Sequence, residues 1–182
     1  TEVLNGRVAV LDTTGRSLLF NVNGENGLGK SRLVDEVIAL VRTRGDVAVL
    51  EGACVPYGEA NVWFPIASAL ATYLDLEPGA PLEAVRATAL ERIQLFGIEE
   101  AKLKGLVVDV FAHLMGYPSP IDKLDAPMAR STIHHAVRAV LETRSQLGPL
   151  VLSIDDLHWA DPVLIDLLDH LVAGLARYPF VL

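Results

Sequence analysis

The chain has 182 residues, of which 51% are apolar and 21% are charged, and it carries a formal net charge of −8. This composition predicts a packed globular domain. The negative charge argues against a surface for nucleic acid or for a membrane, because both partners are polyanionic. Cys54 is the single cysteine, so no disulfide can form within the chain, which favours the reducing cytoplasm. We expect its thiol to be a small buried group near a strand end.

The first predicted elements are a strand, a glycine-rich loop and a helix, in that order. Residues 18–22 are short and mostly apolar, as a buried strand would be. The loop from Gly24 to Ser31 reads Gly-Glu-Asn-Gly-Leu-Gly-Lys-Ser, which fits the pattern G-x-x-x-x-G-K-[ST] at every specified position. The helix that follows is predicted to end near Gly45. Its apolar face would consist of Leu33, Val34, Val37, Ile38, Leu40 and Val41.

This loop predicts a binding site for a nucleoside triphosphate. Glycines let backbone N–H groups close around a phosphate, and the helix N-terminus adds a partial positive charge. Lys30 would reach the β- and γ-phosphates, and the Ser31 hydroxyl would ligate Mg²⁺. The residues predicted to contact the nucleotide are Gly24, Glu25, Asn26, Gly27, Leu28, Gly29, Lys30, Ser31 and Arg32.

The middle of the chain is predicted to be mainly helical. Residues 47–50 read as a second strand, and Pro65 suits a helix start after a loop rich in glycine, proline and aromatic residues. Further helices are predicted near residues 82–96 and 98–115, and Asp125 suits the N-cap of another. With a third strand at residues 150–154, the order predicts an α/β fold: a parallel sheet with helices on both faces and a helical insertion between the second and third strands.

The third predicted strand ends in two acids, as a Walker B motif does. Mg²⁺ bound to the β- and γ-phosphates needs an anionic oxygen opposite the serine hydroxyl, and Asp155 would supply it. A neighbouring carboxylate can orient the attacking water, so Asp156 and Lys30 are the predicted catalytic residues. The alternative for Asp156 is a solvated carboxylate without a catalytic role.

The residues around this motif have structural interpretations that we prefer. Asp161, which is followed by a proline, is predicted to cap a helix rather than to take part in chemistry. For His158, a packed or hydrogen-bonded position is favoured over phosphate sensing, and Trp159 is expected to pack at the end of the sheet. His134 and His135 lie in the middle of a predicted helix without an acidic or cysteine partner at metal spacing, so we assign them no function.

Two strings resemble one known family. Residues 152–162, LSIDDLHWADP, together with GENGLGKSRL at residues 24–33, resemble the signal-transducing ATPase module of the STAND class of AAA-like NTPases. That module occurs in large LuxR-type transcriptional regulators and in proteins fused to nucleotide-cyclase or kinase domains. The resemblance implies a switch that binds ATP and Mg²⁺ and hydrolyses ATP slowly. The partners of such a switch would be other domains of the same polypeptide, and the resemblance also allows for a nucleotide-dependent oligomer.

The chain departs from the family pattern near both of its ends. The family has a helix before the phosphate loop, whereas residues 12–15 would break one here. Residues 180–182 read as the start of a strand that lies between the two motif strands in the family. We therefore expect residues 1–182 to form a P-loop ATPase core without its last strands and helical lid. Two other functions stay open: a small P-loop phosphotransferase (kinase), and a module that binds nucleotide without turnover.

Overall fold

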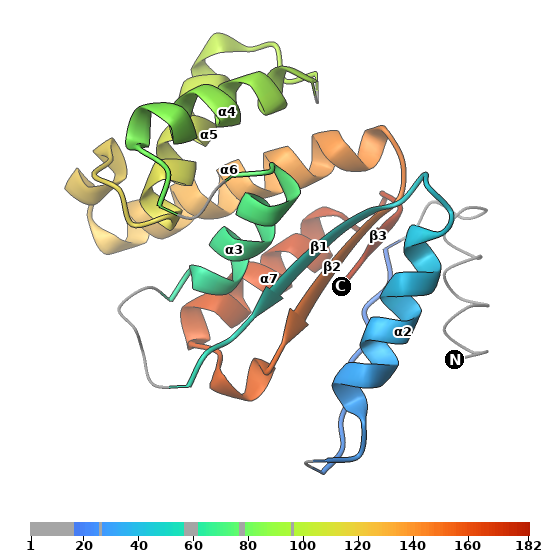
Figure 1. Ribbon diagram of the computed structural model, residues 1–182. Coiled ribbons are helices and arrows are strands. Elements are labelled where there is room, and N and C mark those ends of the chain that lie inside the picture. Colours follow the sequence, from blue (N-terminus) through green and yellow to red (C-terminus); the bar gives the residue numbers. More distant parts are fainter. Residues whose placement is uncertain (1–16, 26, 57–61, 77–78, 96) are drawn as a thin grey trace.

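The computed structural model describes residues 17–25, 27–56, 62–76, 79–95 and 97–182, and its centre is a parallel sheet (Figure 1). The strands are β1 (Ala48–Ala53), β2 (Leu150–Asp155) and β3 (Phe180–Val181), in the spatial order β1-β2-β3. In the register, Ala53 lies opposite Asp155 and Leu150 lies opposite Phe180. The predicted parallel sheet is confirmed, and its second and third predicted strands are β1 and β2.

The segment that leads to the glycine-rich loop runs beside β3. Leu18 forms a parallel bridge with Val181, and its N–H donates to the Phe180 carbonyl over 2.8 Å. The Phe20 N–H donates to the Leu182 carbonyl over 2.7 Å. β3 therefore lies between the two segments that carry the motifs, as the resemblance implies. The strand predicted at residues 18–22 is present only as this bridge, because β3 is two residues long and offers few partners.

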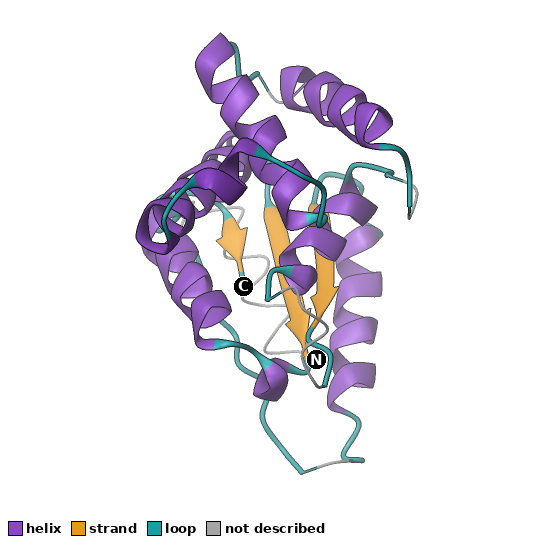
Figure 2. Cartoon of the chain, turned by 90° about the vertical axis from the view of Figure 1, so that its left-hand side faces the viewer, coloured by secondary structure: helices purple, strands orange, loops and turns teal. Residues whose placement is uncertain are grey.

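Helices lie on both sides of the sheet. α2 (Lys30–Arg42) is on one side, and α3 (Phe64–Tyr73) and α7 (Pro162–Gly174) are on the other, with α6 (Ala126–Gln146) beside α7 (Figures 1 and 2). Parallel strands require such crossover connections. The largest fully buried side chains come from the sheet and from the helices on the α3 side. They are Phe180, Leu50, Ile66, Leu74, Ile93, Leu114, Ile133, Leu150, Leu152, Leu164 and Leu167.

The start of α3 presses against β1 at Gly52. A Cβ atom built on Gly52 would lie 2.0 Å from the Pro65 carbonyl oxygen, which belongs to the backbone of the first turn of α3. It would also lie 3.2 Å from Ile154 Cδ1 on β2. Only glycine fits here, so this residue sets how closely α3 approaches the sheet at its carboxyl edge.

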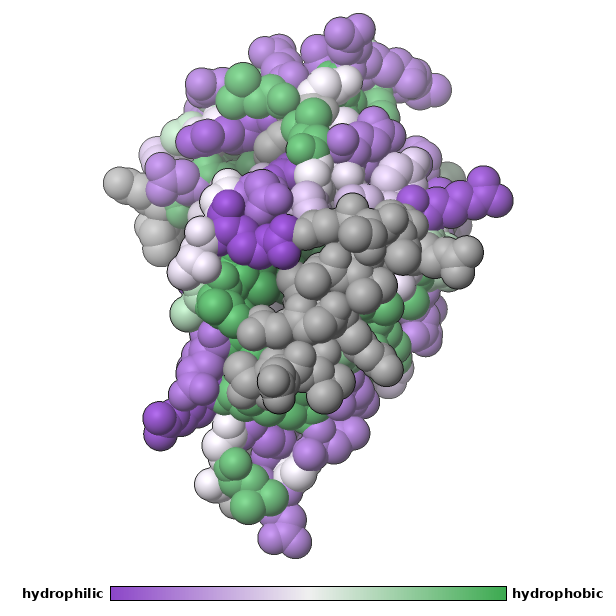
Figure 3. All heavy atoms as spheres, turned by 90° about the vertical axis from the view of Figure 1, so that its right-hand side faces the viewer, coloured by the Kyte–Doolittle hydropathy of each residue, from purple (hydrophilic) through white to green (hydrophobic). Residues whose placement is uncertain are grey.

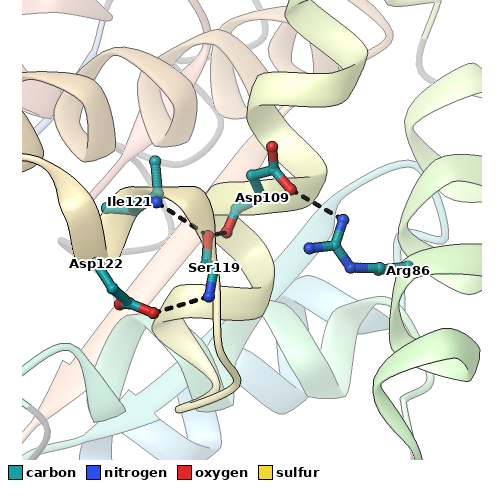
Figure 4. Close-up of polar contacts among 5 residues, drawn as sticks. All are labelled: Arg86, Asp109, Ser119, Ile121 and Asp122. Carbon is teal, nitrogen blue, oxygen red and sulfur yellow. Dashed lines mark hydrogen bonds and ion pairs between the residues drawn. The ribbon is translucent and has the colours of Figure 1, made fainter.

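The predicted helical insertion between β1 and β2 contains α3, α4 (Leu82–Leu95), α5 (Ala101–Leu114), the 3₁₀ turn η1 (Pro120–Lys123) and α6. α5 packs against α3, α4 and α6. A polar network joins α4 to α5 and η1 (Figure 4): Arg86 Nη1 lies 2.9 Å from Asp109 Oδ1, and Ser119 Oγ donates to the Asp109 carbonyl over 2.7 Å. Asp122 Oδ2 accepts the Ser119 N–H over 2.8 Å, which closes a capping box at η1.

Two predicted helix caps are formed. Asp125 Oδ1 accepts the Met128 N–H over 2.8 Å at the start of α6. Asp161 Oδ1 accepts the Val163 N–H over 2.8 Å at the start of α7, and the following Pro162 is the first residue of that helix. The capping interpretation of Asp161 is therefore confirmed, because its carboxylate satisfies a backbone donor that the helix itself leaves unpaired.

Candidate nucleotide-binding site

The glycine-rich loop ends in a backbone conformation that glycine adopts without strain. Gly29 is the N-cap of α2 and has φ 81° and ψ 24°, and Gly27 has φ 85°. With a left-handed residue at the cap, the chain turns directly into the helix, and the Leu33 N–H donates to the Gly29 carbonyl over 2.9 Å. Lys30 and Ser31 are thus the first two residues of α2, where backbone N–H groups are free to bind an anion.

The Lys30 side chain folds back over the loop. Its Nζ donates to the Gly24 carbonyl over 2.9 Å and to the Glu25 carbonyl over 3.0 Å. The ammonium group therefore lies among the loop's own backbone groups, at the point where a phosphate would compete with those carbonyls. Arg32, which is also predicted to contact the nucleotide, pairs with Glu36 along the surface of α2, with Nε and Oε1 3.1 Å apart.

The rest of the loop projects from the carboxyl edge of the sheet. Leu28 is 71% exposed, and Gly24, Glu25 and Ser31 are exposed as well. In Figure 3, which faces the α2 side, the base of the molecule is a narrow projection with both polar and apolar side chains. Asn26 was predicted to contact the nucleotide and lies outside the described residues.

The two acids of the second motif stand at the end of β2. Asp155 Oδ1 accepts the Asp156 N–H over 2.8 Å. Asp156 has φ 53° and ψ 38°, a left-handed conformation that is uncommon outside glycine and that Asp and Asn tolerate best. It is the N-cap residue of the 3₁₀ turn η2 (Leu157–Trp159) without a side-chain capping bond, and its side chain is 57% exposed.

Three neighbours surround this acidic pair. His158 Nδ1 lies 3.8 Å from Asp156 Oδ1, and its ring is 5.0 Å from that of Trp159. Trp159 is 43% exposed, so the expectation that it packs at the end of the sheet is only partly met. Cys54 is buried, as predicted. Burial raises the pKa of its thiol, and the negative charges of Asp156 and then Asp155 raise that pKa further, so the thiol stays protonated at neutral pH.

A cleft of about 330 Å³ connects α2 with Asp155. The sequence had not indicated three of its polar groups: Asp35 of α2, Glu51 of β1 and Ser68 of α3. Asp35 lies one helical turn after Ser31, so helical periodicity gave a signal for it, whereas the other two depend on how the elements pack. The complete lining is Val34, Asp35, Ile38, Glu51, Gly52, Ala53, Phe64, Ser68, Ser153 and Asp155.

The structure brings the two motifs to one edge of the sheet but not into direct contact. The loop and Asp155 both follow parallel strands, whose carboxyl ends meet at the same edge. Among the described residues, no hydrogen bond or ion pair joins Ser31 to Asp155, and no loop residue lines the cleft. The cleft lies between Asp155 and the part of α2 that follows the loop.

The groups present fit a magnesium nucleotide. Helix N–H groups and the Lys30 ammonium suit phosphate oxygens, and the Ser31 hydroxyl and the Asp155 carboxylate are the oxygen ligands that Mg²⁺ prefers. Asp155 uses only Oδ1 in its bond to Asp156, which leaves Oδ2 as a free acceptor within the described part of the chain. Fold and site together define a P-loop nucleotide-binding domain.

The chain belongs to the AAA ATPase domain family, whose model matches residues 8–182. Membership in this family implies nucleotide binding, typically of Mg²⁺–ATP. An uncharacterized protein of Rhizobium meliloti (strain 1021) is 31% identical over 172 residues, which are 92% of this chain and 16% of that relative. The chain thus spans only a small part of the length of the relative. No solved structure matches the chain. Within the described residues, no helix is both long and apolar enough to cross a bilayer.

Proposed function

We propose that this domain is the nucleotide-dependent switch of a larger cytoplasmic signalling or transcriptional regulator, and that it binds Mg²⁺–ATP and hydrolyses it slowly. The observation that carries the proposal is the position of Lys30 Nζ, 2.9 and 3.0 Å from two carbonyls of the phosphate loop. The much greater length of the relative supports a role within a larger polypeptide.

Each motif residue would have a separate task. Lys30 and the first N–H groups of α2 would hold the β- and γ-phosphates. Ser31 and Asp155 would hold Mg²⁺, which would neutralise charge on the phosphates when it is bound. Asp156 would orient the attacking water, because its carboxylate is exposed directly after Asp155 at the end of β2.

α2 is the element through which binding would be transmitted. Its N-terminus carries the loop, and only Ile38 and Val41 of its side chains are fully buried. A helix with two buried side chains loses little packing when it shifts, so phosphate contacts at its N-terminus can change its position. The cleft that it shares with Asp155 would then change shape with the state of the nucleotide.

The test separates binding from hydrolysis with the variant Asp156→Asn. Asparagine keeps the size of the side chain and tolerates the left-handed backbone, so only the charge is lost. We expect unchanged ATP affinity and a fall in phosphate release of about 10²–10⁴-fold. Asp169→Asn removes an exposed carboxylate from α7 and is the matched control. Wild-type turnover in Asp156→Asn would make this residue a structural one.

A second assay distinguishes the switch from the two alternative functions. Multiple-turnover phosphate release is measured with and without small hydroxyl acceptors. Slow release that is independent of acceptors is the result that the proposal predicts. Consumption of ATP only with an acceptor would identify a phosphotransferase, and tight binding without any release would identify a module that holds nucleotide without turnover.

A further inference from the structure

A second cavity lies on the α6 and α7 side of the sheet, the side opposite to α2. It measures about 570 Å³, which is within the range of small-molecule sites. Its lining is rich in groups that donate hydrogen bonds or carry positive charge, which is unusual in a chain with a net charge of −8. The polar residues of the lining are Arg130, Ser131, His134, His135, Arg138 and His170.

Helical spacing brings these groups together. Arg130, His134 and Arg138 are four residues apart along α6 and form one stripe on its surface. His170 comes from α7, and its ring centroid lies 5.2 Å from that of His134. The Trp63 ring also lies beside His134, nearly perpendicular to it, with the ring centroids 6.4 Å apart. Spacing within α6 alone assigns His134 no function, because its partner His170 is 36 residues away along the chain.

Two polar atoms of this lining are buried without a hydrogen-bond partner among the described residues. They are His134 Nε2 and Arg138 Nε. Arg138 Nε lies 3.5 Å from Glu142 Oε2, close enough for an ion pair but not aligned for a hydrogen bond. Buried polar atoms almost always have a partner, and a small movement of either side chain would let a ligand in the cavity supply the one that is missing here.

The charges around the cavity favour an anion. Arg130 pairs with Asp166 over 3.1 Å, but both side chains are about half exposed, so this pair is weak and can rearrange. Burial lowers the pKa of His134, and the positive charges of His170 and Arg130 lower it further, against the opposing effect of Asp166. The neighbouring positive groups therefore add to the effect of burial in favouring the neutral form of His134.

The pKa of His170, the histidine that α7 contributes, is also lowered by burial and by nearby positive groups, which are Arg138 and His135. A cation would meet the same repulsion. Within the described residues, no group of three or more His, Cys, Asp or Glu side chains is arranged to hold a metal ion. An anion, in contrast, would compete with Asp166 for Arg130 and with Glu142 for Arg138.

We propose that this cavity binds a small ligand that bears phosphate or carboxylate groups, with Arg130, Arg138 and His134 as the main donors. Guanidinium groups match the geometry of both oxyanions. The site is separate from the phosphate loop, so it offers a place where a small anionic molecule can act on the domain that the loop controls.

The test is a titration with inorganic phosphate, followed by NMR of the histidine rings. Phosphate can also bind the glycine-rich loop, and His158, beside Asp156, reports on that edge of the sheet. We therefore use the variant Lys30→Ala as the background and expect saturable shifts of His134 and His170 without a shift of His158. Citrate is the probe for carboxylates. Saturable binding of either probe at this position supports the proposal, and no saturable shift with either one overturns it.

Two substitutions test the assigned donors. Arg138→Gln and Arg130→Gln should each weaken phosphate or citrate binding about ten- to a hundredfold, because a hydrogen bond to a charged group is lost. Arg177→Gln removes an exposed charge outside the cavity and should change the affinity little. If Arg138→Gln fails to fold, Arg130→Gln decides, since its side chain is 46% exposed. Equal affinities in Arg130→Gln and Arg177→Gln would overturn the assignment.

Discussion

Replacing Gly52 by alanine tests the packing that shapes the candidate nucleotide site. The new Cβ would lie 2.0 Å from the Pro65 carbonyl oxygen, about 1.4 Å closer than the 3.4 Å at which ordinary contact begins. The obstacle is backbone, so a side chain cannot simply rotate away and α3 has to move. Overpacking of this kind costs about 2–3 kcal/mol of unfolding free energy, which lowers Tm by about 4–12 °C in a domain of this size.

Gly105→Ala is the matched control for this experiment. Gly105 is exposed in the interior of α5, and a Cβ built there meets nothing within 4 Å. The substitution should therefore stabilise the chain by about 0.5–1 kcal/mol, because alanine loses less backbone entropy in a helix than glycine does. Urea denaturation of both variants gives the two free energies. A Gly52→Ala variant as stable as the wild type would refute the close approach of α3.

The remaining predictions concern charge. Asp155→Asn should weaken the Mg²⁺-dependent part of ATP affinity about ten- to a hundredfold, measured by calorimetry with and without Mg²⁺. The hydrogen bond from the Ser119 N–H lowers the pKa of the Asp122 carboxyl below 3.8. The ionised carboxylate therefore stabilises the folded chain above pH 3.8, and this contribution is lost at lower pH. Urea denaturation should show a smaller free energy of unfolding for Asp122→Asn than for the wild type at pH 7, and this difference should shrink below pH 3.8. The pKa values of His134 and His170 are lowered from 6.5, so stability should fall as the pH drops through 6.5, and His134→Gln should flatten this dependence.

Sequence reasoning succeeded where the local backbone demands a particular residue. Gly29 occupies the left-handed position before α2, and Asp125 and Asp161 accept backbone N–H groups at helix starts. These features depend on a few neighbouring residues, so they can be predicted without knowledge of the fold. The parallel order of β1 and β2 followed in the same way from the alternation of strands and helices.

Features that depend on tertiary packing were not predictable. Glu51 of β1 and Ser68 of α3 line the same cleft only because these two elements pack together. His134 and His170 meet only because α6 packs against α7. In each case the partners are far apart in the sequence, and no spacing within one element relates them.

The most direct test of nucleotide binding is isothermal titration of Mg²⁺–ATP into the wild type, Lys30→Ala and the control Lys102→Ala. Lys102 is exposed in the first turn of α5, outside the loop and the cleft, so its loss removes a charge without touching the site. We expect Lys30→Ala to bind about ten- to a hundredfold more weakly, because an ammonium–phosphate hydrogen bond is lost, and Lys102→Ala to bind as the wild type does. Equal affinities in all three proteins would contradict the assignment of the loop as the phosphate site.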